Sequence, residues 1–301
     1  SIPCPDLISY VKNQHTMIMI SFHAPVVGTV LLIAAVLTGW YSRRLHRRQS
    51  IISKTPTTDL GQLSEAPIVE VQAEVIDGET FDSPIGNKEC VLSVWEVDEY
   101  DDTGWETRVS GIDARPFMID DGTGQTRVDI EDHVKAKSNS EWEINWGGLD
   151  IDRMLSVGVS IDDVYCVFDE FSVEHSVSSD CELPPQIAAF ESADPDIPER
   201  SESTIKLGEM DLESKSKRRY FEETITPGQE IYLLCEATAT GETTHPTGPD
   251  DIVLKPRQGE ELTIISDQTQ TDIIADFNQY RWGYAAAGIM AFIGLISFIP
   301  S

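Results

Sequence analysis

Basic residues are scarce in this sequence, and acidic residues are abundant. The 301 residues include 22 Lys plus Arg against 52 Asp plus Glu, which gives a formal net charge of −30. The imbalance lies in residues 51–280, because residues 1–50 contain one acidic residue and residues 281–301 contain none. Nucleic-acid binding depends on Lys and Arg that displace counterions from phosphates, so this composition argues against a nucleic-acid partner. We expect the acidity to be an adaptation to a high-salt cytoplasm, where the Debye length shrinks to about 3 Å.

Cysteines are also few, and no two of them are spaced as Cys-x-x-Cys. That spacing places two sulfurs on one centre, so its absence argues against a zinc knuckle and a redox dithiol. Cys90 and Cys235 fall in apolar stretches with strand character, where we expect small core residues. Cys166 and Cys181 are candidates for a disulfide if their region faces outside, whereas a cytoplasmic position favours free thiols.

Familiar catalytic motifs are missing as well. The sequence contains no His-Glu-x-x-His zinc helix, no Gly-x-x-x-x-Gly-Lys phosphate loop and no Gly-x-Ser-x-Gly elbow. The nearest approach to the elbow is Gly158-Val159-Ser160, which lacks the second glycine. We therefore assign no catalytic, cofactor-binding or metal-ligating residues and no cofactor, and we favour a function other than catalysis.

Two charged clusters have competing interpretations. Asp98, Glu99, Asp101 and Asp102 resemble metal ligands, but they miss the spacing of an EF-hand loop, so we expect a solvated turn. The segment 215–219 holds Lys215, Lys217, Arg218 and Arg219, the densest basic patch of the acidic region. It is either a docking point for an acidic partner or lipid headgroup, or a strand edge with weak local salt bridges, and we favour the second interpretation.

Two long apolar segments lie near the chain ends. Residues 17–41 contain no Asp, Glu, Lys or Arg, and residues 281–301 contain one base. Both reach the 17 to 25 residues that a helix needs to cross the hydrocarbon layer, and aromatic residues flank them as at a membrane interface. The alternatives are a buried core helix or, for the first segment, a cleaved signal peptide. We favour an uncleaved anchor, because the arginines follow this segment instead of preceding it.

Basic residues beside these segments predict the orientation. Arg43, Arg44, Arg47 and Arg48 follow the first segment and Arg281 opens the second, and positive flanks stay on the cytoplasmic side. We therefore expect a cell-membrane protein with two spans and a cytoplasmic soluble region. Residues 1–16 form a tail that precedes Met17, and we expect it to contain a miscalled start.

Between the spans, the pattern is that of a β protein. Residues 42–66 read as a basic and polar linker, and residues 67–280 as an acidic soluble domain with period-two apolar alternation. The clearest hairpin is 116–128, where Asp-Gly-Thr-Gly supplies the turn. Short helices are expected at 184–190 and 268–279. The fold class we predict is mainly β (α+β), a small β-barrel or open sheet with irregular insertions, flanked by two transmembrane helices. Strands are expected at 68–75, 90–97, 105–109, 164–171, 220–225, 230–237, 252–254 and 262–265.

Several of these segments together resemble the GIDE domain, which lies between two spans in Mulan-type E3 ubiquitin ligases and in halophilic archaeal membrane proteins. The resemblance rests on Pro116–Gly124, Arg218–Glu223 and Pro227–Tyr232, with Ser83-Pro84 and the strand at Trp105 upstream. It implies a protein-interaction or membrane-organising module whose partners are the lipid bilayer and an unidentified protein.

The ligases of this family also carry a zinc-binding RING after the second span. No clustered cysteines are present here, so the resemblance does not carry the ligase activity over to this chain. A role in a ubiquitin-like conjugation system is the alternative. An oligonucleotide-binding barrel is a third hypothesis, which the charge disfavours.

Overall fold

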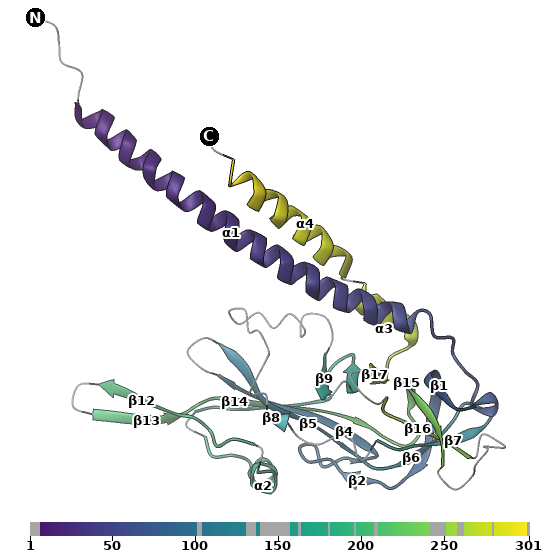
Figure 1. The fold of residues 1–301 in the computed structure, drawn as a ribbon. Helices are drawn as coiled ribbons and strands as arrows, with labels where there is room; N and C mark the ends of the chain where they lie inside the picture. The colour runs from purple at the N-terminus through teal and green to yellow at the C-terminus, as the bar shows by residue number, and fades with distance from the viewer. Residues whose placement is uncertain are drawn as a thin grey trace, which may run out of the picture. The chain divides into compact units, whose positions relative to one another are not determined.

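The computed structural model describes residues 7–100, 104–130, 137–138, 157–161, 164–179, 181–195, 197–207, 210–240, 251–257, 262–278 and 280–299 (Figure 1). The chain divides into two compact units. A helical unit combines residues 1–51 with 275–301, and a β unit comprises residues 52–274.

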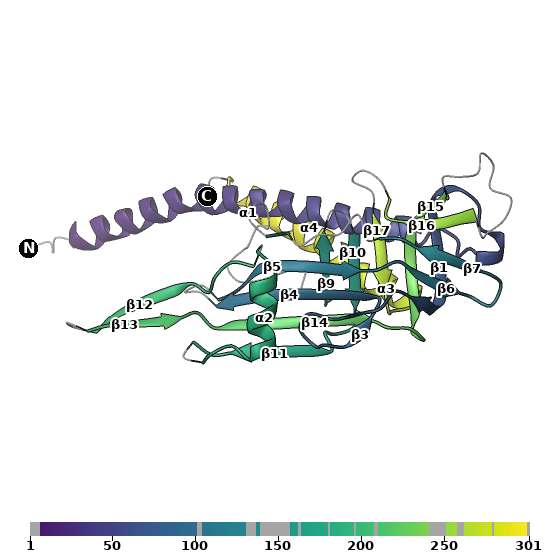
Figure 2. The ribbon, with the colours of Figure 1, turned by 90° about the horizontal axis from the view of Figure 1, so that it is seen from below.

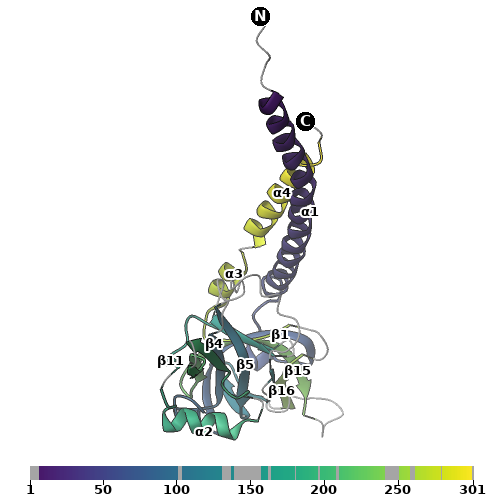
Figure 3. The same cartoon turned by 90° about the vertical axis from the view of Figure 1, so that its left-hand side faces the viewer.

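The helical unit contains two main helices. α1 (Leu7–Ile52) runs for 46 residues and α4 (Tyr280–Ile296) for 17 residues. Figure 3 shows α4 alongside α1. α1 therefore begins before the predicted span at residue 17 and continues through nearly half of the predicted linker 42–66. A shorter helix, α3 (Gln270–Phe277), precedes α4 and agrees with the helix expected at 268–279.

The β unit is organised around a closed ring of five strands. β1 (Ala66–Gly78) pairs with β6 (Phe117–Asp120), and β6 pairs with β7 (Gln125–Val128). β7 runs parallel to β16 (Ile252–Lys255), which pairs with β15 (Glu230–Ala239), and β15 returns to β1. If these five strands are numbered by their order in the chain, their order around the ring is 1-2-3-5-4. Strands 3 (β7) and 5 (β16) are parallel. This is the arrangement of an OB-type barrel.

One side of the barrel is extended. β17 (Thr263–Ser266) continues along the edge of β15 beyond β16, and it pairs in parallel with β10 (Val164–Phe168). β9 (Val157–Ile161) completes the sheet. Because β10 and β17 are parallel, their carboxyl ends lie at the same edge, where Asp169 follows one strand and Asp267 follows the other.

Two insertions into the barrel build a second sheet. β4 (Leu92–Tyr100) and β5 (Trp105–Ala114) lie between β1 and β6 in the sequence, and β11 (Val173–Val177) and β14 (Arg218–Ile225) lie between β7 and β15. They form an antiparallel sheet in the order β11-β14-β4-β5-β8, in which β8 is Lys137–Ser138. The insertions that the sequence predicted as irregular are thus largely a regular sheet, because strands far apart in sequence pair with one another.

Smaller elements surround these sheets. α2 (Pro185–Ala193) lies across β5, β4 and β14 in Figure 2 and agrees with the helix expected at 184–190. The hairpin of β12 (Glu202–Leu207) and β13 (Met210–Lys215) extends past the end of β14 (Figures 1 and 2). The remaining pieces are η1 (Leu60–Gln62) and the hairpin of β2 (Phe81–Asp82) and β3 (Glu89–Cys90).

β4 is buried on both faces and separates two cores. Leu92 and Val94 point into the barrel core, whereas Trp95 and Val97 point into a second core beneath α2. The Trp95 ring lies edge-on to Phe190 of α2, with ring centroids 4.9 Å apart. It also lies against Gly111 of β5, where a Cβ would overlap the indole, so this position requires glycine. The prediction of a mainly β fold with a barrel is confirmed.

Candidate functional site

The contact between α1 and α4 is made by small residues. A Cβ added to Gly294 would lie 3.0 Å from the backbone oxygen of Gly28, and one added to Gly28 would lie 2.9 Å from the oxygen of Gly294. At the other end of the contact, Gly283 packs directly on Ser42, whose hydroxyl donates to the Thr38 carbonyl at 2.7 Å. The helices therefore run antiparallel and approach closely, as membrane helices with small-residue interfaces do.

Large apolar side chains of the same helices point outward. Val36 is 71% exposed on α1, and Phe292 and Ile289 of α4 are similarly exposed. Residues 26–52 of α1 form the one described stretch that is long and apolar enough to cross a membrane, and only 17% of its apolar window is buried. A core helix of a soluble protein would bury most of its large side chains, so residues 26–52 of α1 are a candidate membrane span.

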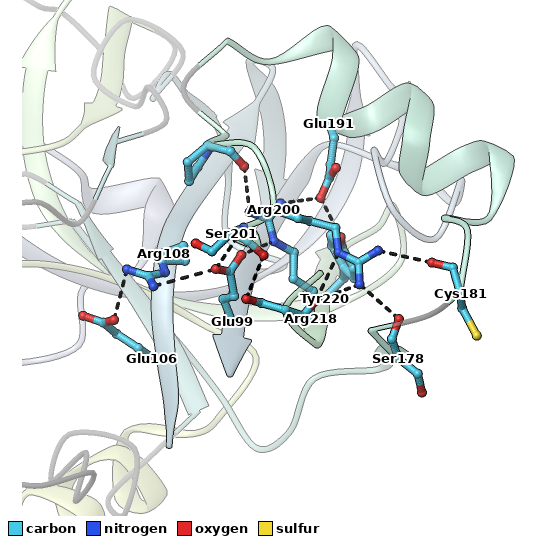
Figure 4. A network of polar contacts seen from close by, with 12 residues as sticks. Glu99, Glu106, Arg108, Ser178, Cys181, Glu191, Arg200, Ser201, Arg218 and Tyr220 are labelled. Atoms are coloured by element: carbon cyan, nitrogen blue, oxygen red, sulfur yellow. Dashed lines mark hydrogen bonds and ion pairs between the residues drawn. The ribbon is translucent and has the colours of Figure 1, made fainter. Parts of the chain in front are cut away.

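In the β unit, the most elaborate polar cluster surrounds Arg218 of β14 (Figure 4). Its guanidinium is fully buried and pairs with Glu99 of β4 at 2.7 Å and with Glu191 of α2 at 2.6 Å. It also donates to the Pro198 carbonyl at 2.7 Å, while the Tyr220 hydroxyl donates to Glu191 at 2.6 Å. The cluster ties α2 and the segment after it to the second sheet.

Electrostatics within this cluster favour its charged form. Burial alone would raise the pKa of Glu99, but hydrogen bonds from Ser201 and Arg218 and the charges of Arg218 and Arg108 bring it below its ordinary value. Burial and the hydrogen bond to Glu191 raise the pKa of Tyr220. The tyrosine therefore stays neutral and the glutamate stays ionised at neutral pH.

Arg200 makes a second clamp beside this cluster. It donates to the carbonyl oxygens of Ser216, Ser178 and Cys181 at 2.7, 3.0 and 3.2 Å. Figure 4 shows its guanidinium reaching toward Ser178 and Cys181. Both arginines thus satisfy loop carbonyls and carboxylates of the fold, which is a structural role.

Glu222 is a fully buried carboxylate with four donors. Ser83 Oγ and Ser93 Oγ donate to it at 2.7 and 3.2 Å, and the backbone N–H groups of Ile85 and Gly86 donate at 2.8 and 2.6 Å. The carboxylate fixes the β2–β3 turn against the second sheet. Nothing in the local sequence marks this role, because the partners lie more than 125 residues away along the chain.

The two charged clusters of the sequence are resolved differently from expectation. Asp98 and Glu99 are buried on β4, so the prediction of a solvated turn is wrong for these two residues, while Asp101 and Asp102 lie outside the described residues. β14 is flanked by β11 and β4, so Arg218 and Arg219 are not at a strand edge, and Arg218 forms an interior ion pair. Lys215 ends β13 of the two-stranded β12–β13 sheet, which is an edge position. Among the described residues, no group of three His, Cys, Asp or Glu side chains is placed to hold a metal ion.

Two further basic side chains of that segment, those of Lys217 and Arg219, lie over aromatic rings. The Arg219 guanidinium lies 3.8 Å from the centroid of Trp105, and Lys217 lies 5.8 Å from that of Tyr100. Such cation–π contacts involve two of the charges that the sequence offered as a docking point, whereas Lys215, at the end of β13, is exposed.

The burial predicted for Cys90 and Cys235 is confirmed. Cys90 and Cys235 are buried, and burial raises the pKa of each thiol to about 12. Cys166 is buried and Cys181 exposed, and both are free thiols. Cys4 lies outside the described residues.

The 116–128 hairpin is confirmed as β6 and β7 around Gly122, whose φ is +83°. Asp121 accepts the Leu60 N–H at 2.7 Å and hydrogen bonds from Thr123 and Gly124 within its own turn. Burial alone would raise the pKa of Asp121, but these hydrogen bonds lower it below its ordinary value. Its turn therefore holds η1 against the barrel.

Comparison with protein-family models, curated proteins and solved structures finds no match for this chain. The GIDE-like segments occupy the β6–β7 hairpin, β14 and the turn before β15. In that turn, Gly228 donates to the Val75 carbonyl at 2.6 Å and so aligns β15 with β1. The resemblance itself stays a prediction from the sequence.

Proposed function

We propose that this chain is a two-span membrane protein. In it, α1 and α4 form an antiparallel helix pair in the membrane, and the β unit is a protein-interaction module. The observation that carries the proposal is the packing of the helical unit, in which glycines bring the two backbones close together while many large apolar side chains stay exposed. In a membrane, these exposed apolar side chains would contact lipid tails instead of water.

The second span rests on α4. Its 17 helical residues rise about 25 Å at 1.5 Å per residue, close to the thickness of the hydrocarbon layer. Residues 282–299 contain no charged side chain. α4 packs antiparallel on α1 over most of its length. If α1 spans the hydrocarbon layer, α4 lies in the same layer, which supports α4 as a second span.

The side of the membrane follows from the arginines. Arg43, Arg44, Arg47 and Arg48 follow the apolar part of α1, and Arg281 precedes that of α4, so both helices carry positive charge where they lead to the β unit. The positive-inside rule then places the β unit in the cytoplasm.

Protein interaction is the activity that best fits the β unit. Its charged interior groups around Arg218 and Glu222 pair with one another and fix loops, as structural groups do. An OB-type barrel is a frequent binding scaffold, but its charge here disfavours nucleic acid, and the GIDE resemblance points to proteins.

The anchor and its orientation are tested by protease protection. Intact cells and inverted membrane vesicles are treated with protease, and antibodies to the β unit follow the product. We expect cleavage in inverted vesicles only, and resistance of the anchored fragment to carbonate extraction. Release by carbonate would refute the anchor, and cleavage in intact cells would refute the cytoplasmic side.

The interaction is tested by photocrosslinking from exposed positions of the β unit, such as Glu79 and Glu174, in cells at their growth salt. We expect one partner to be captured reproducibly. A version with the crosslinker at buried Val71 is the matched control, because this position has no access to a partner. Equal capture patterns from exposed and buried positions would refute a specific interaction.

A further inference from the structure

The described arginines of the β unit are occupied within the fold. In a chain with 30 excess negative charges, these cations find carboxylates, carbonyl oxygens or aromatic rings close by. Arg108, Arg127 and Arg218 form ion pairs, Arg200 and Arg257 donate to backbone carbonyls, and Arg115 and Arg219 lie over aromatic rings.

The helical unit differs in this respect. Arg43 and Arg47 of α1 and Arg281 of α4 are exposed, and within the described part of the chain none of the three forms an ion pair. Residues 26–51 and 280–299 contain no Asp or Glu. We call these three residues the arginine cluster.

Helix packing holds the arginine cluster at one level. Arg43 and Arg47 are four residues apart and so share a face of α1. In this same turn, Ser42 packs on Gly283, and the His46 ring lies 4.6 Å from that of Tyr280, the neighbour of Arg281. The close contact of α1 with α4 therefore places the three arginines at the same level along the helix pair.

Aromatic side chains mark this level as the membrane interface. Trp40 is 60% exposed one turn before Arg43, and Trp282 is 80% exposed beside Arg281. Tryptophan concentrates at the level of lipid headgroups, and the apolar surfaces of both helices begin directly beyond these two rings.

We infer that the arginine cluster is a binding site for the phosphate groups of anionic phospholipids. The inference rests on the proposed membrane anchor and names the lipid class that it prefers. Guanidinium groups bind phosphate through paired N–H donors, and basic residues at the interface attract anionic headgroups. An acidic protein surface is the competing occupant, but the two tryptophans place the cluster at headgroup depth.

The test uses the full chain reconstituted into vesicles. Lipids brominated in their acyl chains quench tryptophan fluorescence on contact, and they are supplied either as phosphatidylcholine or as phosphatidylglycerol. The triple variant Arg43→Gln, Arg47→Gln, Arg281→Gln is compared with Lys88→Gln, Arg127→Gln, Lys255→Gln, which removes the same charge from the β unit.

For the wild-type chain and the control variant, we expect association with brominated phosphatidylglycerol to exceed that with brominated phosphatidylcholine by about fivefold or more. The attraction of a single interfacial arginine to an anionic surface already corresponds to about this factor. In the triple variant, which keeps Arg44 and Arg48, the preference should be lower than in the control variant by about fivefold or more. The wild-type preference should also weaken at high salt because the interaction is screened. Equal quenching by both lipids in the wild type would overturn the inference while leaving the anchor intact. Absence of quenching by either lipid would instead refute the anchor.

Discussion

Replacing Gly294 by alanine should loosen the contact between α1 and α4. The added Cβ would lie 3.0 Å from the Gly28 carbonyl oxygen and 3.0 Å from Leu32 Cγ, whereas ordinary contacts lie at 3.4 to 4 Å. Relieving this overlap requires the helices to separate by a few tenths of an ångström, and overpacking of this kind costs about 1–3 kcal/mol.

The chain offers a matched control in the same helix. A Cβ at Gly288 meets no atom within 4 Å. Both Gly→Ala changes improve helix propensity by up to about 1 kcal/mol, so this gain cancels when the two variants are compared. The free energy needed to separate the two helices should therefore be lower in the Gly294→Ala variant than in the Gly288→Ala variant, by about 1–3 kcal/mol.

A disulfide reports on this packing. A Cβ at Gly39 lies 3.9 Å from that of Ala287, within the range that a disulfide spans, so Gly39→Cys with Ala287→Cys should crosslink. The reporter is placed in a Cys4→Ser, Cys181→Ser background, and crosslinking is followed as SDS is titrated into the solubilised protein. Loss of crosslinking at the same SDS concentration in the Gly294→Ala and Gly288→Ala versions would refute the close contact.

Three further predictions concern the β unit. Arg218→Met should destabilise it by about 3–5 kcal/mol in denaturant unfolding, because two carboxylates lose their counterion in the interior. Arg127→Met removes an exposed ion pair and should change stability by less than about 1 kcal/mol. Similar effects of the two changes would contradict a buried network. Burial, with the charges of Asp169 and Glu223, raises the pKa of Asp267 to about 6, so its ionisation in the folded state is unfavourable. The protonated carboxyl of Asp267 therefore stabilises the fold at pH values below its pKa in the unfolded chain, and this stabilisation is lost as the pH rises toward 6. Asp267→Asn should accordingly raise the denaturant midpoint of unfolding at pH 7 and leave it unchanged near pH 3. A maleimide should label Cys181 rapidly and Cys90 only on unfolding, and fast labelling of Cys90 in the native protein would argue against its burial.

The sequence by itself determined the features that depend on local pattern. Period-two alternation located β1, and an apolar run located β15. Asp-Gly-Thr-Gly located the β6–β7 turn, because strand faces and positive φ are properties of neighbouring residues. Uninterrupted apolar length likewise located α1 and α4, since spanning length is a matter of composition.

Only the tertiary structure decided which distant residues meet. Glu99 and Arg218 are 119 positions apart, and their pairing turns an apparent solvated turn and an apparent basic patch into one buried cluster. The ring closure between β1 and β15 and the pairing of two insertions into one sheet are equally non-local. A side chain's charge is set by its sequence, but its burial, its partner and hence its role depend on strand pairings that no local pattern encodes.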